Sequence, residues 1–392
     1  MSPLSERRSR LAAVLQAFHP LWHAQPFREQ RPAWCEEQPA LTANLLALPD
    51  EAAATLNDDS DAALALLAKY LPELTEMPSL AAVPQCRAQP LAQHGARWAW
   101  EIPGRKQAQI EAFVAATRPG GVSVLDWCGG KGHLGRLLAL EWKRPLQTLE
   151  IDPQLCAAGS FLADKLALDH RFWQDDALAT RDWPKAGQHA VALHACGDLH
   201  RRLITQGSAA GVSHFDVAPC CYYRGVEQVY MPLAGSSTLN LTRDDLRLAV
   251  TETVTASPRL ARQRDREMAW KLGFDVFRRE HGSGAYRSFK PVPAAWFRGG
   301  FADFLHRMAV REGLPAPGSA VSIQHFETQG WQRQREVMRL SIVRHAFRRA
   351  LEVWLVLDLA SYLEHSGYTV ELGTFCPRRL TPRNLLISAG RA

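Results

Sequence analysis

Strands and helices alternate between residues 123 and 221, and this alternation limits the possible folds more than any other feature of the sequence. Apolar runs with strand character alternate with segments of helical periodicity, at 123–128, 133–142, 146–152, 153–168, 189–196, 198–211 and 214–221. Such alternation is typical of a parallel, doubly wound α/β sheet. A long helical segment at 345–368 and two further strands at 369–376 and 383–390 follow near the C-terminus. We expect these strands to close the same sheet as an antiparallel hairpin.

The rest of the chain suggests two additions to this core. Residues 1–95 are rich in Ala and Leu at helical spacing and predict a helical N-terminal domain. The core then occupies 96–224, an insertion occupies 225–335, and the closing helix and hairpin occupy 336–392. An insertion after the fifth strand lies where additions usually shape a substrate site.

The stretch "DWCGGKGHLG" follows the first strand and has the composition of a ligand-binding loop. Glycines let the backbone approach a ligand, and the next helix offers free N–H groups. A nucleoside triphosphate would require a hydroxyl residue after Lys131, where Gly132 stands. A nicotinamide or flavin cofactor would require G-x-G-x-x-G, which Gly130, Gly132 and Gly135 meet only loosely.

The same stretch resembles motif I of class I S-adenosylmethionine methyltransferases, in which an acid at the end of the first strand precedes the glycines. That resemblance implies an acid after the second strand for the ribose hydroxyls, and Glu150 is present there. It also implies a polar residue after the third strand for the adenine, which Asp175 and Asp176 supply. Capping of a helix is the alternative role for Glu150 and Asp176, and it is the favoured role for Asp152. The predicted cofactor-binding residues are Asp126, Cys128, Gly129, Gly130, Lys131, Gly132, His133, Leu134, Glu150, Ile151, Asp175, Asp176, Ala177 and His194.

Two further motifs, "HACGDL" and "PCCYY", narrow the resemblance to one branch of these enzymes. The chain resembles the methyltransferase-like protein 25 group and, more distantly, the tRNA 2′-O-methyltransferase that modifies the acceptor stem. The similarity covers about 104–221 and returns in the closing helix and hairpin. The implied fold is α/β, with a Rossmann-like seven-stranded sheet. The zinc modules of the tRNA enzyme are missing and the insertion matches no motif, so the substrate does not carry over.

Methyl transfer requires an acceptor placed opposite the sulfonium and, for a weakly acidic acceptor, a base. The carboxyl ends of the fourth and fifth strands carry the predicted catalytic residues His194, Asp198, Cys220 and Cys221, with Tyr222 beside them. His194 or Asp198 is the expected base, and a purely structural role for His194 is equally compatible with the sequence.

Four cysteines, Cys128, Cys196, Cys220 and Cys221, follow three strands that neighbour one another in such a sheet. We expect them to converge as small buried residues. Covalent attack on a base and metal binding are the alternatives, and the absence of C-x-x-C spacing argues against a metal. No structural metal is therefore expected.

The composition bears on the partner and on the location. The net charge is +6, and the segment 259–298 alone holds ten Arg or Lys against four Asp or Glu, with seven interleaved aromatic residues. This pattern predicts binding of structured RNA such as tRNA or rRNA through arginines and stacking; the alternative is an aromatic core with solvated arginines.

No apolar run approaches the ~20 residues of a membrane span, and the eight cysteines are too sparse for a disulfide scaffold, so we expect a cytoplasmic protein. A protein or small-molecule methyltransferase and a catalytically silent cofactor- or RNA-binding module remain alternatives.

Overall fold

The computed structural model describes residues 2–95, 97–252, 258–282, 284 and 286–391. The chain divides into two compact units, which are described separately here. Unit 1 comprises Met1–Ala17, Glu76–Val254 and Arg348–Ala392, and unit 2 comprises Phe18–Thr75 and Thr255–Phe347.

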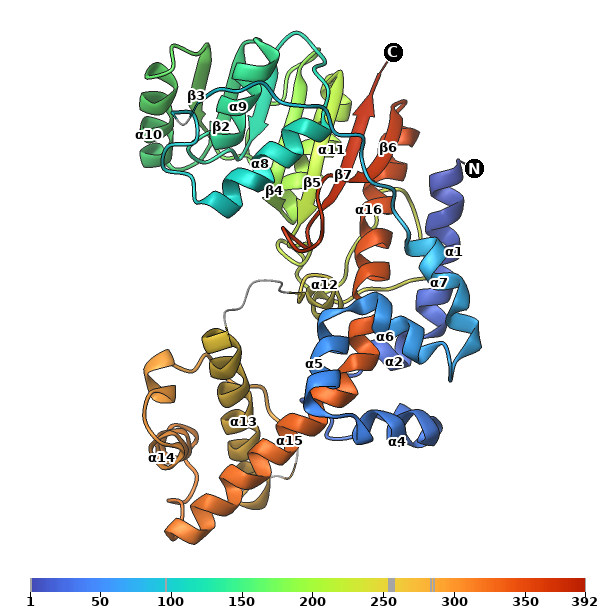
Figure 1. The fold of residues 1–392 in the computed structure, drawn as a ribbon, viewed down its shortest axis with the longest axis vertical. Coiled ribbons are helices and arrows are strands. Elements are labelled where there is room, and N and C mark those ends of the chain that lie inside the picture. Colours follow the sequence, from blue (N-terminus) through green and yellow to red (C-terminus); the bar gives the residue numbers. More distant parts are fainter. Residues whose placement is uncertain (1, 96, 253–257, 283, 285, 392) are drawn as a thin grey trace. The chain divides into compact units, whose positions relative to one another are not determined.

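Unit 1 is built on a seven-stranded sheet with the order β3-β2-β1-β4-β5-β7-β6 (Figure 1). The first five strands are parallel, and β7 runs antiparallel to both β5 and β6. The strands are β1 Val124–Trp127, β2 Leu146–Glu150, β3 His170–Gln174, β4 His189–Cys196, β5 His214–Cys220, β6 Thr369–Thr374 and β7 Leu385–Gly390. The predicted α/β class, with a Rossmann-like seven-stranded sheet and a closing antiparallel hairpin, is confirmed.

Helices cover both faces of this sheet. The helices of unit 1 are α1 Pro3–Ala17, α7 Met77–Ala81, α8 Gly104–Ala116, α9 His133–Trp142, α10 Pro153–Asp164, α11 Asp198–Ala210, α12 Arg243–Leu248 and α16 Arg348–His365. Phe113 of α8 and Leu138 of α9 belong to one hydrophobic cluster with Val124 of β1. On the opposite face, the indole Nε1 of Trp127 donates to the carbonyl of Leu199 in α11 at 2.9 Å. The carboxyl ends of the parallel strands are thereby left as the edge on which polar residues can gather.

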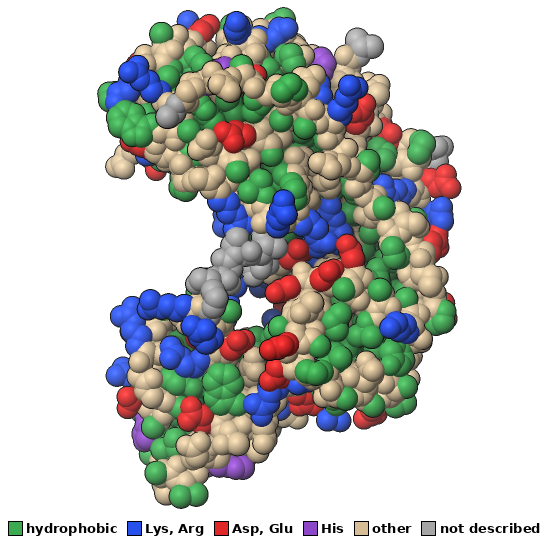
Figure 2. All heavy atoms as spheres, in the orientation of Figure 1, with side chains coloured by type: hydrophobic (Ala, Val, Ile, Leu, Met, Phe, Trp, Pro, Cys, Tyr) green, Lys and Arg blue, Asp and Glu red, His purple; other side chains and the backbone are tan. Residues whose placement is uncertain are grey.

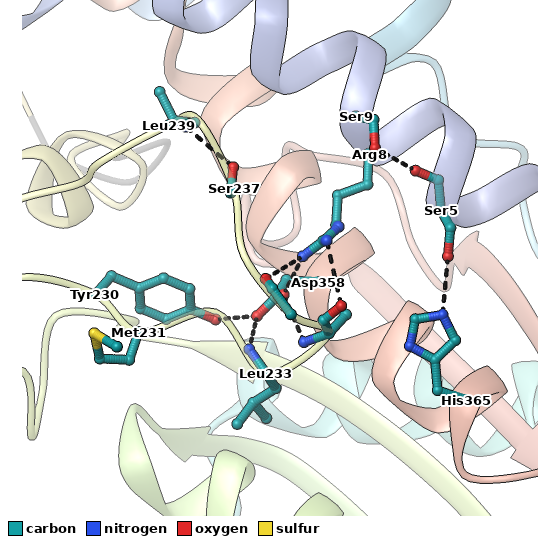
Figure 3. A network of polar contacts seen from close by, with 12 residues as sticks. Ser5, Arg8, Ser9, Tyr230, Met231, Leu233, Ser237, Leu239, Asp358 and His365 are labelled. Carbon is teal, nitrogen blue, oxygen red and sulfur yellow. Dashed lines mark hydrogen bonds and ion pairs between the residues drawn. The ribbon is translucent and has the colours of Figure 1, made fainter. Parts of the chain in front are cut away.

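A buried carboxylate in helix α16 connects α1 to the sheet unit (Figure 3). Asp358 of α16 is fully buried and accepts hydrogen bonds from Arg8 (2.7 Å), from the Tyr230 hydroxyl (2.9 Å) and from two backbone N–H groups of the segment after β5. Helix α1 therefore packs with the sheet unit, against α16 and α7, rather than in a separate N-terminal domain.

Unit 2 is helical. It contains α2 His19–His23, α3 Trp34–Glu37, α4 Pro39–Ala47, α5 Asp50–Asp58, α6 Ser60–Leu67, α13 Pro258–Glu280, the short 3-10 helix η2 Ala294–Phe297, α14 Phe301–Glu312 and α15 Ala320–Ala346, and a further 3-10 helix, η1 Pro72–Glu76, leads out of it. The long helix α15 packs against α13 and against the N-terminal helices α2, α4, α5 and α6.

The two units cut across the boundaries that the sequence suggested. The predicted N-terminal domain 1–95 is shared, because α1 and α7 lie in unit 1 and α2–α6 lie in unit 2. The predicted insertion 225–335 is shared as well, since its first part stays with the sheet and α13–α15 join the N-terminal helices. The closing segment also begins later than 336, because residues up to Phe347 belong to unit 2. None of the described helices is long and apolar enough to cross a bilayer.

The aromatic residues of the basic segment form a hydrophobic core in unit 2. Trp270, Phe274, Phe277 and Phe297 are each less than 5% exposed and pack with Phe304 of α14. The prediction that these aromatics stack on bases is therefore wrong for the buried ones. The spacing of Trp270, Phe274 and Phe277 reflects burial of one face of α13.

Candidate functional site

The loop after β1 is organised around Asp126. This carboxylate is 2% exposed, and it accepts a hydrogen bond from the backbone N–H of Gly135 at 3.1 Å. A side chain at Gly129 would place its Cβ only 2.4 Å from the Asp126 carboxylate, so only glycine fits there. Burial raises the pKa of Asp126 to about 7. Asp126 therefore fixes the glycine loop from beneath.

Glu150, at the end of β2, holds the same loop from the neighbouring strand. Its carboxylate accepts hydrogen bonds from the backbone N–H groups of Gly130 (3.0 Å), Ile151 (2.9 Å) and Asp152 (3.0 Å). Gly130 has a φ of 61°, and a Cβ there would meet nothing within 4 Å. Glu150 and the open side of the glycine loop at Gly130 therefore both lie at the carboxyl edge of the sheet.

The end of β3 lies next to Glu150. The backbone N–H of Asp175 donates to the Glu150 carbonyl at 3.1 Å, and the Asp176 carboxylate accepts from the backbone N–H of Leu178 at 2.9 Å. Ala177 is buried, whereas the side chain of Ile151 is exposed. Asp152 caps α10 through Gln154 and Leu155, as predicted. This contact lies within the turn after β3, and no helix begins between β3 and β4 among the described residues, so Asp176 does not cap a helix. Its role toward a cofactor stays a prediction.

The remaining predicted loop residues are tied to the segment before α8. Lys131 donates to Glu101 at 3.0 Å, and the buried His133 contacts Arg136 at 2.7 Å. Burial, then the charge of Arg136, lowers the pKa of His133 to about 4. Gly132 precedes the first residue of α9, and Leu134 packs in the hydrophobic cluster beneath it.

His194 is held by a residue that the sequence did not single out. Gln109 of α8 donates through its side-chain nitrogen to the Leu380 carbonyl (3.1 Å), which leaves its oxygen facing Nε2 of His194 at 3.1 Å. His194 Nε2 must then carry the proton, and Nδ1 keeps the lone pair. Burial, followed by the charge of Lys106, lowers the pKa of His194. The imidazole is therefore neutral at pH 7, with Nδ1 able to accept a proton.

Three of the four predicted cysteines converge. The sulfur atoms of Cys196, Cys220 and Cys221 all lie within 4.8 Å of one another, with 3.5 Å between Cys196 and Cys220. Hydrogen bonding from Cys196 and Cys220, then the charges of Arg224 and Arg383, lowers the pKa of Cys221.

Cys128 does not belong to this group among the described residues, contrary to the prediction. Burial, then the charge of Glu150, raises its pKa to about 12, which keeps it a thiol. Cys128 follows β1, which lies one strand further from β5, and Asp126 and the Cys196 thiol also lie near enough to raise its pKa.

Three neighbouring strands end in a strained backbone. Cys128 after β1, His194 near the end of β4 and Cys221 after β5 have φ values of 57°, 70° and 45°, in the left-handed region that non-glycine residues rarely adopt. The pairing of β4 with β5 also shifts between Leu193 and Cys196. Such strain costs of order 1–3 kcal/mol per residue and clusters at functional sites. This edge of β1, β4 and β5 is the candidate active site.

Asp198 and Tyr222 complete the predicted set. Asp198 is the first residue of α11, and its carboxylate lies 3.7 Å from Arg201. Tyr222 is 1% exposed, and its hydroxyl donates to the Pro219 carbonyl at 3.4 Å. Tyr222 is thus part of the packing beneath the cysteines.

Unit 2 carries a second candidate site, which we call the arginine pocket. It has a volume of about 820 Å³ and is lined by Arg259, Arg262, Gln263, Asp265, Arg266, Ala294, Phe297, Arg298 and Trp331. In the space-filling view, Lys and Arg side chains gather over the start of α13 (Figure 2). Asp265, the one acid in the lining, accepts from Gln334 at 3.2 Å. The pocket suits an anionic ligand.

Comparison with known proteins finds similarity for one part of the chain. Residues 105–228 match a protein-family model described as a methyltransferase domain, about a third of the chain. The glutathione S-transferase C-terminal domain-containing protein homolog of Drosophila pseudoobscura pseudoobscura is 33% identical over 124 residues, 30% of this chain. This chain spans only 20% of the length of that relative.

Solved methyltransferases are among the structures similar to this chain. The geranyl diphosphate C-methyltransferase from Streptomyces coelicolor A3(2) is 14% identical, with a TM-score of 0.26 over 40% of this chain and 63% of its own. A TehB-like SAM-dependent methyltransferase from Corynebacterium glutamicum is 15% identical, with a TM-score of 0.23 over 30% of this chain and 62% of its own. The part of the chain that matches the family model, residues 105–228, includes the five parallel strands of unit 1 and is similar to a methyltransferase domain.

Proposed function

We propose that this chain is an S-adenosylmethionine-dependent methyltransferase and that it methylates structured RNA. The observation that carries the cofactor assignment is the position of Glu150. Its carboxylate lies at the end of β2 against the N–H of Gly130, beside the open side of the glycine loop. A carboxylate there can accept both hydroxyls of a ribose, with the Gly130 contact exchanged for one of them.

The residues of the loop fit the rest of the cofactor. Free N–H groups at the start of α9 and the glycines of the loop favour a close approach of the cofactor's amino-acid part, and the turn after β3 offers Asp175 and Asp176 for the adenine. When bound, S-adenosylmethionine supplies an electrophilic methyl group. The chain's own task is then to position the acceptor and to remove its proton.

His194 is the proposed base. Its Nδ1 bears the lone pair because Gln109 fixes the proton on Nε2, and its lowered pKa keeps it neutral at pH 7. A proton from an acceptor hydroxyl or amine would move to Nδ1. Asp198, half-exposed at the start of α11, is the second candidate for this role.

The arginine pocket supports RNA as the substrate. Arg259, Arg262, Arg266 and Arg298 converge on one concave surface together with Trp331. Planar guanidinium groups bind phosphate oxygens in pairs, and a half-exposed tryptophan can stack on a base. The buried aromatics of α13 take no part in this contact.

Calorimetry tests the cofactor assignment. S-adenosylmethionine should bind the full-length chain, and Glu150→Gln should weaken binding about tenfold to hundredfold, because a neutral amide loses charge-assisted hydrogen bonds to the ribose. Asp169→Asn is the matched control, since Asp169 is an exposed acid at the amino end of β3. No binding by the unaltered chain, or equal binding by Glu150→Gln, would contradict the assignment.

The substrate is tested by transfer of a labelled methyl group. RNA, protein and small-molecule fractions are prepared from a strain that lacks the gene and are incubated with the chain and the labelled cofactor. We expect label in structured RNA. Label confined to protein or to small molecules would replace the RNA proposal and leave the cofactor assignment intact.

A further inference from the structure

The thiols of Cys196, Cys220 and Cys221 form a compact group at the ends of β4 and β5. Cys196 and Cys220 are paired across the two strands, and Cys221 follows directly. All three are free cysteines. They meet because the two strands are neighbours in space, so the absence of C-x-x-C spacing in the sequence does not argue against a shared ligand.

The sulfur positions match a tetrahedral metal site. Sulfur atoms bound at about 2.3 Å to one tetrahedral zinc ion lie about 3.8 Å from one another. The Cys196–Cys220 distance is 3.5 Å, and every pair of sulfurs lies within 4.8 Å. Only a few tenths of an ångström to one ångström of side-chain movement would bring all three onto one ion.

The backbone around the thiols is fixed before any ligand binds. Gly197 donates to the Cys220 carbonyl at 3.0 Å, and Asp198 donates to the Arg224 carbonyl at 3.2 Å. A Cβ at Gly197 would lie 2.0 Å from that Arg224 oxygen, so the two strand ends are in close contact. The strained φ of 45° at Cys221 keeps its thiol beside those of the other two cysteines. A preorganised set of ligands of this kind favours specific metal binding.

The chemistry of the donors selects the metal. Thiolates favour soft or borderline ions such as zinc and do not suit magnesium or calcium. Cys220 is 4% exposed, while Cys196 and Cys221 are half-buried, so an ion can reach the group from solvent. Within the described part of the chain, no fourth His, Cys, Asp or Glu joins these three ligands. Three protein ligands with one open position is the arrangement of catalytic zinc sites.

We propose that Cys196, Cys220 and Cys221 bind one zinc ion and leave its fourth position to water or to a substrate atom. Binding replaces the thiol protons, which are released to solvent. This site is distinct from the cofactor loop, and its existence does not depend on the proposed methyl transfer.

The test uses the reduced, full-length chain without cofactor or RNA. Cobalt(II), which reports on its ligands by its absorption spectrum, is titrated into the protein freed of metal. We expect one equivalent to give the visible bands of tetrahedral cobalt and a thiolate charge-transfer band, and zinc to displace it. Cys196→Ser, Cys220→Ser and Cys221→Ser should each lose the charge-transfer intensity. Cys86→Ser, on the segment that pairs with Thr374 of β6, should keep it.

Metal analysis of the unaltered protein provides a measurement that needs no variant. About one zinc per chain, together with proton release on binding, is expected. Circular dichroism shows whether each serine variant is folded. Absence of the cobalt spectrum in the reduced protein, its persistence in all three variants, or a disulfide among these thiols in place of metal would overturn the proposal.

Discussion

At the carboxyl edge of unit 1 the polar side chains are held by hydrogen bonds to backbone groups or to a neighbouring side chain, whereas in the arginine pocket of unit 2 long side chains surround an open space. Glu150 accepts from three backbone N–H groups, and His194 is fixed through Gln109. In the pocket, Arg259, Arg262 and Arg298 are exposed. Side chains held in place by such hydrogen bonds suit one ligand of defined shape. Long exposed arginines can adjust to a polymer with repeated anionic groups. Ordering these side chains on binding costs more side-chain entropy.

The largest expected effect is a loss of stability in unit 2 that leaves the chemistry of unit 1 unchanged. Phe274 is fully buried in the aromatic cluster, so Phe274→Ala should lower the free energy of unfolding of unit 2 by about 3–5 kcal/mol. Val310→Ala on α14 is the control and should cost less than about 0.5 kcal/mol, since Val310 is 82% exposed. Urea unfolding followed by tryptophan fluorescence measures both.

Cofactor affinity gives the second half of this test. The hydrophobic cluster beneath the glycine loop shares no residue with the aromatic cluster of unit 2. The Phe274→Ala chain should therefore bind S-adenosylmethionine with unchanged affinity under conditions in which unit 1 stays folded. A parallel loss of stability and cofactor affinity would show that the two units are energetically one.

A smaller effect should distinguish the pocket from a generally basic surface. Arg262→Gln combined with Arg266→Gln removes two charges from the pocket lining. If both contact phosphates, the slope of log K against log salt should fall by about 2. Filter binding of structured RNA at several salt concentrations measures the slope. Arg335→Gln, an exposed arginine of α15 outside the pocket lining, should change it little; an equal change would assign the binding to net charge alone.

The sequence was most informative where the signal is local. The sequence signals for these features lie within a few residues of the element they define. They are the Asp152 cap followed by Pro153, the apolar strand that carries Asp126, and the acid Glu150 at the end of the next strand. The order of the parallel strands then placed Cys196 beside Cys220. The same reasoning wrongly added Cys128 to the group of converging thiols, because strand adjacency does not determine where a side chain points.

Long-range contacts account for the parts that could not be predicted. Arg8 and Asp358 are 350 residues apart in sequence, yet this buried pair attaches α1 to the sheet unit. Gln109 lies on a helix whose periodicity gives no sign of its contact with His194. The aromatics of α13 have the same spacing whether they pack inward or stack on bases, and only the burial of Phe274 and Phe277 separates the two interpretations.

The smallest expected effect concerns how firmly His194 is held at the candidate active site. Gln109 contacts His194 and is a positioning residue, so its replacement should shift the pH dependence of methyl transfer. If the neutral imidazole of His194 is the base, as proposed, the rate should fall as the pH decreases through the His194 pKa. Gln109→Glu places a carboxylate beside Nε2, which should raise that pKa by about 1 unit and move the acid limb to higher pH. Gln109→Leu removes the acceptor, so the acid limb should move to lower pH. The plateau rate should also fall a few-fold, because the imidazole ring can then rotate.

Rates measured across the pH range with saturating cofactor provide the check. Equal plateau losses in both variants with an unmoved acid limb would reduce Gln109 to a packing residue and would remove His194 from the role of base.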